Sequence, residues 1–165
     1  VPNLAGLVDD ARAAGAMVVW IQQTTLPFGM SDSAAWRAFK ERDGKNPEYT
    51  LDGTWGQGFI EPLEVRDGEP VVRKFRSSAF VGTDLDLILR ASGIETLVIC
   101  GCVTEGCVES TVRSATFHDY YTYLVEDCVA SATAMNHEAS MTVMRSRYRV
   151  HPREFYAGKW ELGGN

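Results

Sequence analysis

Apolar residues along the chain follow two alternating spacings, one typical of helices and the other of strands. Apolar positions three or four residues apart predict helices over residues 4–14, 85–92, 107–117 and 136–147. Short runs rich in β-branched residues predict strands over residues 17–21, 70–74, 96–100, 121–127 and 148–150. Strands that alternate with helices indicate a mainly parallel sheet covered on both faces, with the functional site at the carboxyl ends of the strands.

One long segment, residues 24–69, interrupts this alternation. It is polar and rich in turn-forming residues, and only Trp36 and Phe39 indicate a short helix within it. A connection of this length inside a compact domain is usually functional. We therefore expect it to form a lid or one wall of a binding pocket.

Length and composition are those of an ordinary globular protein. The chain has 165 residues, which suits one domain, and 45% of them are hydrophobic. The net charge of −6, from 16 basic and 22 acidic residues, disfavours nucleic acid and anionic membrane surfaces as partners. The sequence has no apolar run long enough to cross a membrane and no visible secretion leader. Four cysteines in a chain of this size do not make a disulfide scaffold, so free thiols in a reducing cytoplasm are expected.

Three of the four cysteines lie close together in the segment VICGCVTEGCVEST, at positions 100, 102 and 107. Structural zinc needs four ligands, usually in paired knuckles, and only His118 lies near these thiols, so a zinc site is disfavoured. A disulfide is disfavoured in a reducing compartment. Cys100 and Cys128 fit core positions, because free cysteine behaves as a small buried apolar residue.

Cys107 differs from the other cysteines because it follows a strand and a short glycine-containing turn and opens a helix. The free backbone N–H groups and the dipole at a helix start favour a thiolate, and the same N–H groups can bind an oxyanion. The position is analogous to the nucleophile elbow of serine hydrolases. Two interpretations stay open on these residues alone: a catalytic nucleophile, or a buried residue at a helix cap.

A nucleophilic thiol needs a partner, and the nearest histidine does not qualify. His118 lies eleven residues along the same helix, or about 16 Å from Cys107 at the rise of an α-helix. Lys74 ends a predicted strand whose carboxyl end faces the same crevice, so its ammonium group could hold a thiolate. The sequence alone favours a simpler interpretation, a solvated lysine at a strand end.

Several motifs together resemble the isochorismatase-like cysteine hydrolases. They are RKFRSSAFVGTDLD, GCVTEGCVEST, and LVEDCVAS with HEASM, and the resemblance extends over nearly the whole chain. It implies a three-layer, Rossmann-like α/β/α fold with a mainly parallel six-stranded sheet. It also implies an Asp–Lys–Cys triad in which the cysteine attacks an amide carbonyl.

Carried over motif by motif, the resemblance makes Cys107 the nucleophile and Lys74 the lysine of the triad. It places a cis peptide between Cys102 and Val103, and an oxyanion hole at the backbone N–H groups of Val103 and Cys107. The family aspartate ends a first strand, just before the first helix, but Val1 already stands at the approach to that helix. We therefore expect one domain, residues 1–165, that lacks an N-terminal segment with the central strand and is inactive as it stands.

The segment after the second family strand reads WIQQTTLPFGMSD and has no histidine, so a metal-dependent nicotinamidase is disfavoured and no metal or cofactor is expected. GTWGQGFIEPL is similar to segments of ureidoacrylate, biuret and N-carbamoyl amidohydrolases. The resemblance therefore implies hydrolysis of a small amide or ureido C–N bond through a thioester-type intermediate. The candidates for substrate contacts are Trp55, Arg76, Ser77 and Phe80. For Arg76 and Ser77, hydrogen bonding within their own loop is an equal alternative.

Two other functions remain possible at this stage. One is cleavage of a vinyl ether, as in true isochorismatases, and the other is a non-catalytic binding scaffold of the same fold. The resemblance also implies a homo-oligomer, either a dimer or a tetramer. Iodoacetamide labelling of Cys107 near neutral pH separates an activated thiol from an inert one.

Overall fold

The computed structural model describes residues 1–160, and helices alternate with strands through most of them. The helices are α1 (Pro2–Ala13), α2 (Ala34–Glu41), α3 (Leu85–Ala91), α4 (Glu109–Phe117) and α5 (Ala134–Arg147). The strands are β1 (Trp20–Gln23), β2 (Val71–Lys74), β3 (Thr96–Cys102), β4 (Tyr121–Ala130) and β5 (Arg149–His151). The sequence pattern predicted each of these elements, with shifts of a few residues at their ends.

The strands form two parallel sheets within residues 1–160. One sheet has the order β1-β2 and the other has the order β3-β4-β5. The mixed α/β class and the parallel pairing agree with the sequence analysis. The single six-stranded sheet does not occur in the described residues, which form five strands in two sheets.

Strand β1 begins later than the apolar run predicted, at Trp20 and not at Met17. The reason lies in its partner, because a strand extends only as far as its ladder of hydrogen bonds. The N–H of Trp20 donates to the carbonyl of Pro70 at 2.9 Å, and the paired register then runs from Val71 to Lys74. The last pair joins Gln23 to Lys74, which places both side chains at the carboxyl end of the sheet.

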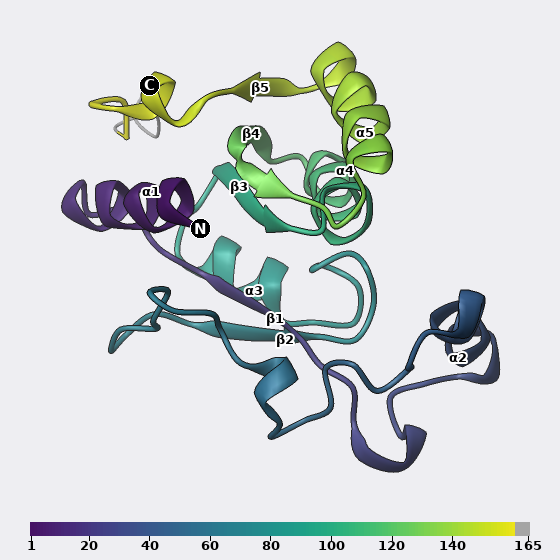
Figure 1. Ribbon diagram of the computed structural model, residues 1–165. Coiled ribbons are helices and arrows are strands. Elements are labelled where there is room, and N and C mark those ends of the chain that lie inside the picture. The colour runs from purple at the N-terminus through teal and green to yellow at the C-terminus, as the bar shows by residue number, and fades with distance from the viewer. Residues whose placement is uncertain (161–165) are drawn as a thin grey trace.

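The three-stranded sheet is covered on both faces, as Figure 1 shows for α1 on one side and α4 with α5 on the other. Successive side chains of β3 point to opposite faces. Val98 and Cys100 join a cluster built around Leu7 of α1, whereas Ile99 packs against the apolar residues of α4 and α5. The sheet is therefore the middle of three layers.

Strand β3 is apolar along most of its length, yet none of its seven residues is fully buried. Its neighbour β4 contrasts with it, because Leu124 and Val125 of β4 have no exposed surface. In the described residues β3 pairs only with β4, and β1 pairs only with β2. One edge of each strand is thus unpaired, and the two strands belong to different sheets that meet at their carboxyl ends.

The segment between β1 and β2 extends away from the sheets. Figure 1 shows α2, which it contains, standing apart from both of them. The sequence predicted a short helix at this position and a functional role for the segment. None of the helices in residues 1–160 is long and apolar enough to cross a membrane.

Candidate active site

The structure brings Lys74 and Cys107 together although 32 residues separate them in the sequence. The Nζ atom of Lys74 lies 3.1 Å from the Sγ atom of Cys107. Lys74 ends β2, and Cys107 lies in the turn after β3, so the carboxyl ends of the two sheets meet at this pair. The side chain of Lys74 is buried, which removes the interpretation of a solvated lysine at a strand end.

The nucleophile turn, residues 101–108, has an unusual backbone. Gly101 has a φ of +119°, a conformation that favours glycine, and the register of β3 against β4 shifts beside it. The peptide bond between Cys102 and Val103 is cis. One π-helical turn, Thr104–Val108, follows and leads directly into α4. The predicted helix start, at about Cys107, lies within this π-helical turn and two residues before α4.

All three donors of the Lys74 ammonium group have an acceptor. They point to the Oε1 atom of Gln23 at 2.5 Å, to the carbonyl of Arg76 at 3.0 Å, and to Cys107. Two of these acceptors are neutral, and Lys74 forms no ion pair with a carboxylate within residues 1–160. The ammonium group of Lys74 is thus buried and fully hydrogen-bonded, with the Cys107 thiol as one of its three acceptors.

Gln23 was missed by the sequence analysis, although its position held a signal. It is the residue paired with Lys74 in the β1–β2 register, and it is polar at the end of an apolar run. Neighbouring side chains at the carboxyl end of a parallel sheet face the same crevice. The strand pairing itself, however, is visible only in the folded structure.

The surroundings of the other three thiols raise their pKa values, although Cys102 as a residue is exposed. It raises the pKa of Cys100 to about 12 and that of Cys128 to about 11. The pKa of Cys102 is raised by burial and by the nearby Cys107, and Lys74 opposes this shift. A thiol with a raised pKa holds little thiolate at neutral pH, so the environment separates Cys107 from its neighbours.

Helix α5 and the residues that follow β4 make hydrogen bonds to the turn that contains Cys107. The hydroxyl of Thr104, a residue with no exposed surface, lies 2.9 Å from the Nδ1 atom of His137. The hydroxyl of Ser131 donates to Glu105 at 2.9 Å. The sequence analysis did not predict this contact of His137. A hollow of about 340 Å³ lies beside α5 and this turn. It is lined by Glu105, Glu109, Asn136, Ala139, Ser140 and Val143.

The residues predicted to contact substrate occupy four different environments. Phe80 is 9% exposed and stacks on His118 with ring centroids 4.8 Å apart, which favours a role in the core. Trp55 is 96% exposed, and Ser77 is partly buried. Arg76 donates to the carbonyls of Ser31 at 3.0 Å and Phe75 at 2.7 Å. These bonds match the alternative in which Arg76 binds its surrounding loops.

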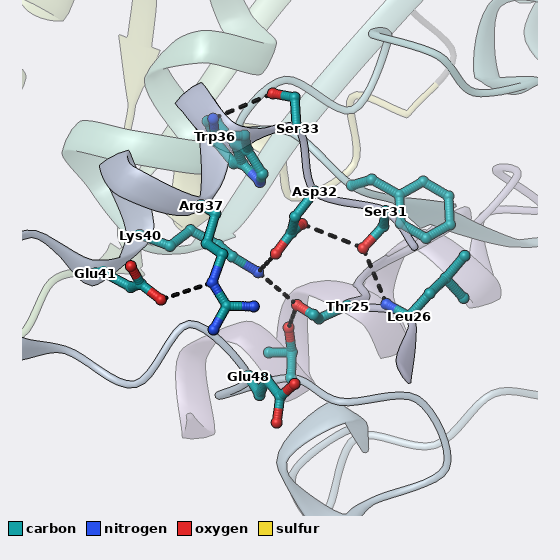
Figure 2. Close-up of polar contacts among 12 residues, drawn as sticks. Thr25, Leu26, Ser31, Asp32, Ser33, Trp36, Arg37, Lys40, Glu41 and Glu48 are labelled. Atoms are coloured by element: carbon teal, nitrogen blue, oxygen red, sulfur yellow. Dashed lines mark hydrogen bonds and ion pairs between the residues drawn. The ribbon is translucent and has the colours of Figure 1, made fainter. Parts of the chain in front are cut away.

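The segment between β1 and β2 holds a buried ion pair near this site. Figure 2 shows Lys40 between Asp32 and Thr25, with Nζ 2.6 Å from the Asp32 carboxylate and 3.1 Å from the Thr25 hydroxyl. Burial raises the pKa of Tyr49, with smaller contributions from the charges of Cys107 and Asp32. The pKa of Tyr49 therefore responds both to the thiol and to the ion pair.

Fold and site together define a class: parallel α/β proteins with a lysine-bound cysteine between a strand and a helix. The chain belongs to the isochorismatase domain family, whose model matches residues 1–151. Among solved structures, it is similar to an isochorismatase family protein from Desulfovibrio vulgaris, with 30% identity and a TM-score of 0.83. That match covers 93% of this chain and 80% of the other.

Two curated relatives are named as amidohydrolases. The chain is 34% identical over 142 residues to a ureidoacrylate amidohydrolase, RutB, of Methylorubrum extorquens. That match covers 80% of this chain but only 57% of the relative. It is 31% identical to a maleamate amidohydrolase of Pseudomonas putida, over 90% of this chain and 68% of the relative. The chain thus spans little more than half the length of the RutB relative.

A further similar structure is the pyrazinamidase of Pyrococcus horikoshii in complex with zinc. It has 26% identity and a TM-score of 0.79, over 92% of this chain and 84% of the other. Within residues 1–160 of the present chain, no group of three or more His, Cys, Asp and Glu side chains is arranged to hold a metal ion.

Proposed function

We propose that the protein is a cysteine-dependent hydrolase that cleaves a small amide or ureido C–N bond, with Cys107 as its nucleophile. The observation that carries this proposal is the 3.1 Å contact between the buried ammonium group of Lys74 and the thiol of Cys107. Membership of the isochorismatase family and similarity to two amidohydrolases support it. No cofactor takes part in the proposed reaction.

In the proposed mechanism the Cys107 thiolate attacks the carbonyl carbon of the substrate. A C–S bond forms, and the carbonyl electrons move onto the oxygen, which accepts hydrogen bonds from the N–H groups of Val103 and Cys107. The intermediate collapses, the C–N bond breaks, and the leaving nitrogen takes up a proton. Water then attacks the thioester or carbamoyl-thioester and releases the acid and the thiol.

The lysine has a fixed place in this scheme. Its three hydrogen bonds leave its ammonium group no freedom to rotate away from the sulfur, so the charge pair is preorganised before substrate binds. Each cycle converts the thiolate to a neutral thioester and back. Lys74 stabilises the charged state at both ends of the cycle, and Gln23 holds Lys74 in position.

The scheme needs a group that handles the proton, and we propose an aspartate at the end of a further strand. The unpaired edges of β1 and β3 support this proposal, because a strand that pairs with both would join the two sheets into one of six strands. Such a strand would end between Gln23 and Cys102, beside the Lys74–Cys107 pair. Residues 1–160 alone would then form an incomplete site.

Ammonia release from a panel of small amides and ureido compounds tests the proposed function. We expect turnover by a version of the protein in which a strand ending in aspartate precedes residue 1, and none after Cys107→Ser. The matched control is Cys128→Ser, because Cys128 is buried on the opposite side of the sheet from α4. Turnover that survives Cys107→Ser would contradict the proposal, and robust turnover by residues 1–165 alone would contradict the need for the aspartate.

The same assay distinguishes the two alternatives. An isochorismatase-type vinyl ether hydrolase would release pyruvate from isochorismate and no ammonia from the panel. A binding scaffold would do neither, and its Cys107 would react with iodoacetamide as slowly as Cys102. The contact with Lys74 favours the amidohydrolase, because a thiolate pairs with a carbonyl electrophile in acyl transfer.

A further inference from the structure

The outer part of the segment between β1 and β2, residues 26–49, is called the arm here. It is well ordered internally: the Lys40–Asp32 ion pair leaves only 2% and 4% of these side chains exposed, and Trp36 stacks on Phe39. Figure 2 shows these polar contacts linking α2 to the chain that leads into it. Buried charges are tolerated only when they are paired, so this ion pair holds the arm in one conformation.

The arm is joined to the later part of the protein at one residue. Among the described residues, the polar and aromatic contacts between residues 26–49 and the chain beyond residue 57 are all made by Arg76. Its guanidinium group lies 4.9 Å from the ring centroid of Trp36 and donates to the carbonyl of Ser31 at 3.0 Å. The side chain of Arg76 thus binds the arm both by stacking on Trp36 and by a charge-assisted hydrogen bond to Ser31.

Arg76 also contacts the reacting pair, through its backbone. Its carbonyl accepts a hydrogen bond from Lys74 Nζ at 3.0 Å, and that nitrogen contacts Cys107. One residue therefore contacts the arm with its side chain and the catalytic lysine with its main chain. Both side-chain hydrogen bonds of Arg76 come from its Nη1 atom, and one face of the guanidinium group stacks on Trp36.

We propose that Arg76 is a positioning residue that fastens the arm beside the Lys74–Cys107 pair and so determines which molecules reach the thiol. The inference rests on the proposed function, because it assigns the arm the control of access to that same site. The arm lies one residue away from the reacting pair, because Arg76 contacts Ser31 of the arm and Lys74 of the pair. Release of the arm would open the thiol to larger molecules.

The test compares the alkylation rates of Cys107 by a small reagent, iodoacetamide, and by a bulky uncharged maleimide. In Trp36→Ala and in Arg76→Ala we expect the ratio of the bulky to the small rate to rise roughly tenfold, because a stacking contact of this kind is lost. Trp36→Phe keeps an aromatic face under Arg76 and should restore most of the original ratio. Arg37→Ala is the matched control, because Arg37 lies on the same helix and pairs only with the exposed Glu41.

Unchanged ratios in both alanine variants, with folding verified by circular dichroism, would overturn the inference. If either alanine variant does not fold, hydrogen exchange of residues 26–49 in Trp36→Leu and in the parent protein decides instead, because the arm should exchange faster when the aromatic face under Arg76 is lost. Failure of the proposed function is recognised separately: Cys107 would then react slowly with iodoacetamide in the parent protein, whatever the ratio.

Discussion

At the scale of single residues, environment and not residue type distinguishes the four cysteines. Cys107 faces a buried ammonium group, whereas burial raises the pKa values of Cys100, Cys102 and Cys128. The difference arises because a charge 3.1 Å away stabilises a thiolate, while an apolar environment destabilises it. The chemistry of the site therefore depends on one contact between two side chains.

Lys74→Met tests this contact. It keeps the length of the side chain and removes the charge, so we expect the alkylation rate of Cys107 by iodoacetamide at pH 7 to fall roughly tenfold or more. Peptide mapping by mass spectrometry measures the rate at each cysteine. Equal rates in the variant and the parent protein would remove Lys74 from the mechanism.

At the scale of secondary-structure elements, polar bridges fix how the elements meet. Glu69 lies before β2 and accepts hydrogen bonds from Arg12 of α1 at 2.7 Å and from the Trp20 indole of β1 at 2.6 Å. The hydrogen bond from Arg12, together with those from Arg66 and Trp20, lowers the pKa of Glu69 to about 2. This carboxylate thus joins the first helix to both strands of the smaller sheet.

Glu69→Gln should therefore reduce stability in a pH-dependent way. The folded pKa lies below the ordinary value of 4.5, so the stabilisation is present above pH 4.5 and is lost as the pH falls towards 2. We expect a loss of about 1–3 kcal/mol at pH 7 and a smaller difference at pH 3, measured by denaturant unfolding. Glu48→Gln, at an exposed position, is the control. The same loss at both pH values would contradict the assignment.

At the scale of the whole molecule, the two sheets meet through the active site and the apolar core. Val72 of β2, Leu89 of α3 and Ala115 of α4 share one cluster, and Ile21 and Ile99 of the two sheets pack against it. Side chains therefore connect the two sheets, whereas the backbones of β1 and β3 are not paired with each other. The partial burial of the apolar strand β3 is consistent with the further strand proposed above.

A strand placed between the sheets should protect both edges. We expect backbone amides of β1 and β3 to exchange with deuterium at least roughly tenfold more slowly in a version with the preceding strand than in residues 1–165. Amides of β4, which is paired on both sides in residues 1–160, serve as the internal reference. Equal exchange of β3 in the two versions would contradict the proposed strand. The homo-oligomer stays a prediction, and sedimentation of the longer version measures it.

Most of the fold could be predicted because helix and strand periodicities are local properties of the sequence. The ends of the elements could not be predicted, because they depend on which strands pair. Strand β1 begins where it pairs with Val71, and β3 continues to Cys102 because it pairs with β4 there. In the site, motifs pointed to Cys107 and Lys74, but Gln23 and Tyr49 lie outside these motifs, and the HEASM motif does not reveal that His137 contacts Thr104. Their roles arise from contacts between distant segments.

The sequence by itself determined the alternation of helices and strands, the position of Cys107 in the turn after a strand and the net charge that disfavours nucleic acid as a partner. These follow from spacing and composition, which are properties of neighbouring residues. Only the tertiary structure decided that Lys74 is buried against the thiol and that Arg76 binds the arm. Both depend on where β2, β3 and the arm meet in space, and no local pattern specifies a distance between residues so far apart in the chain.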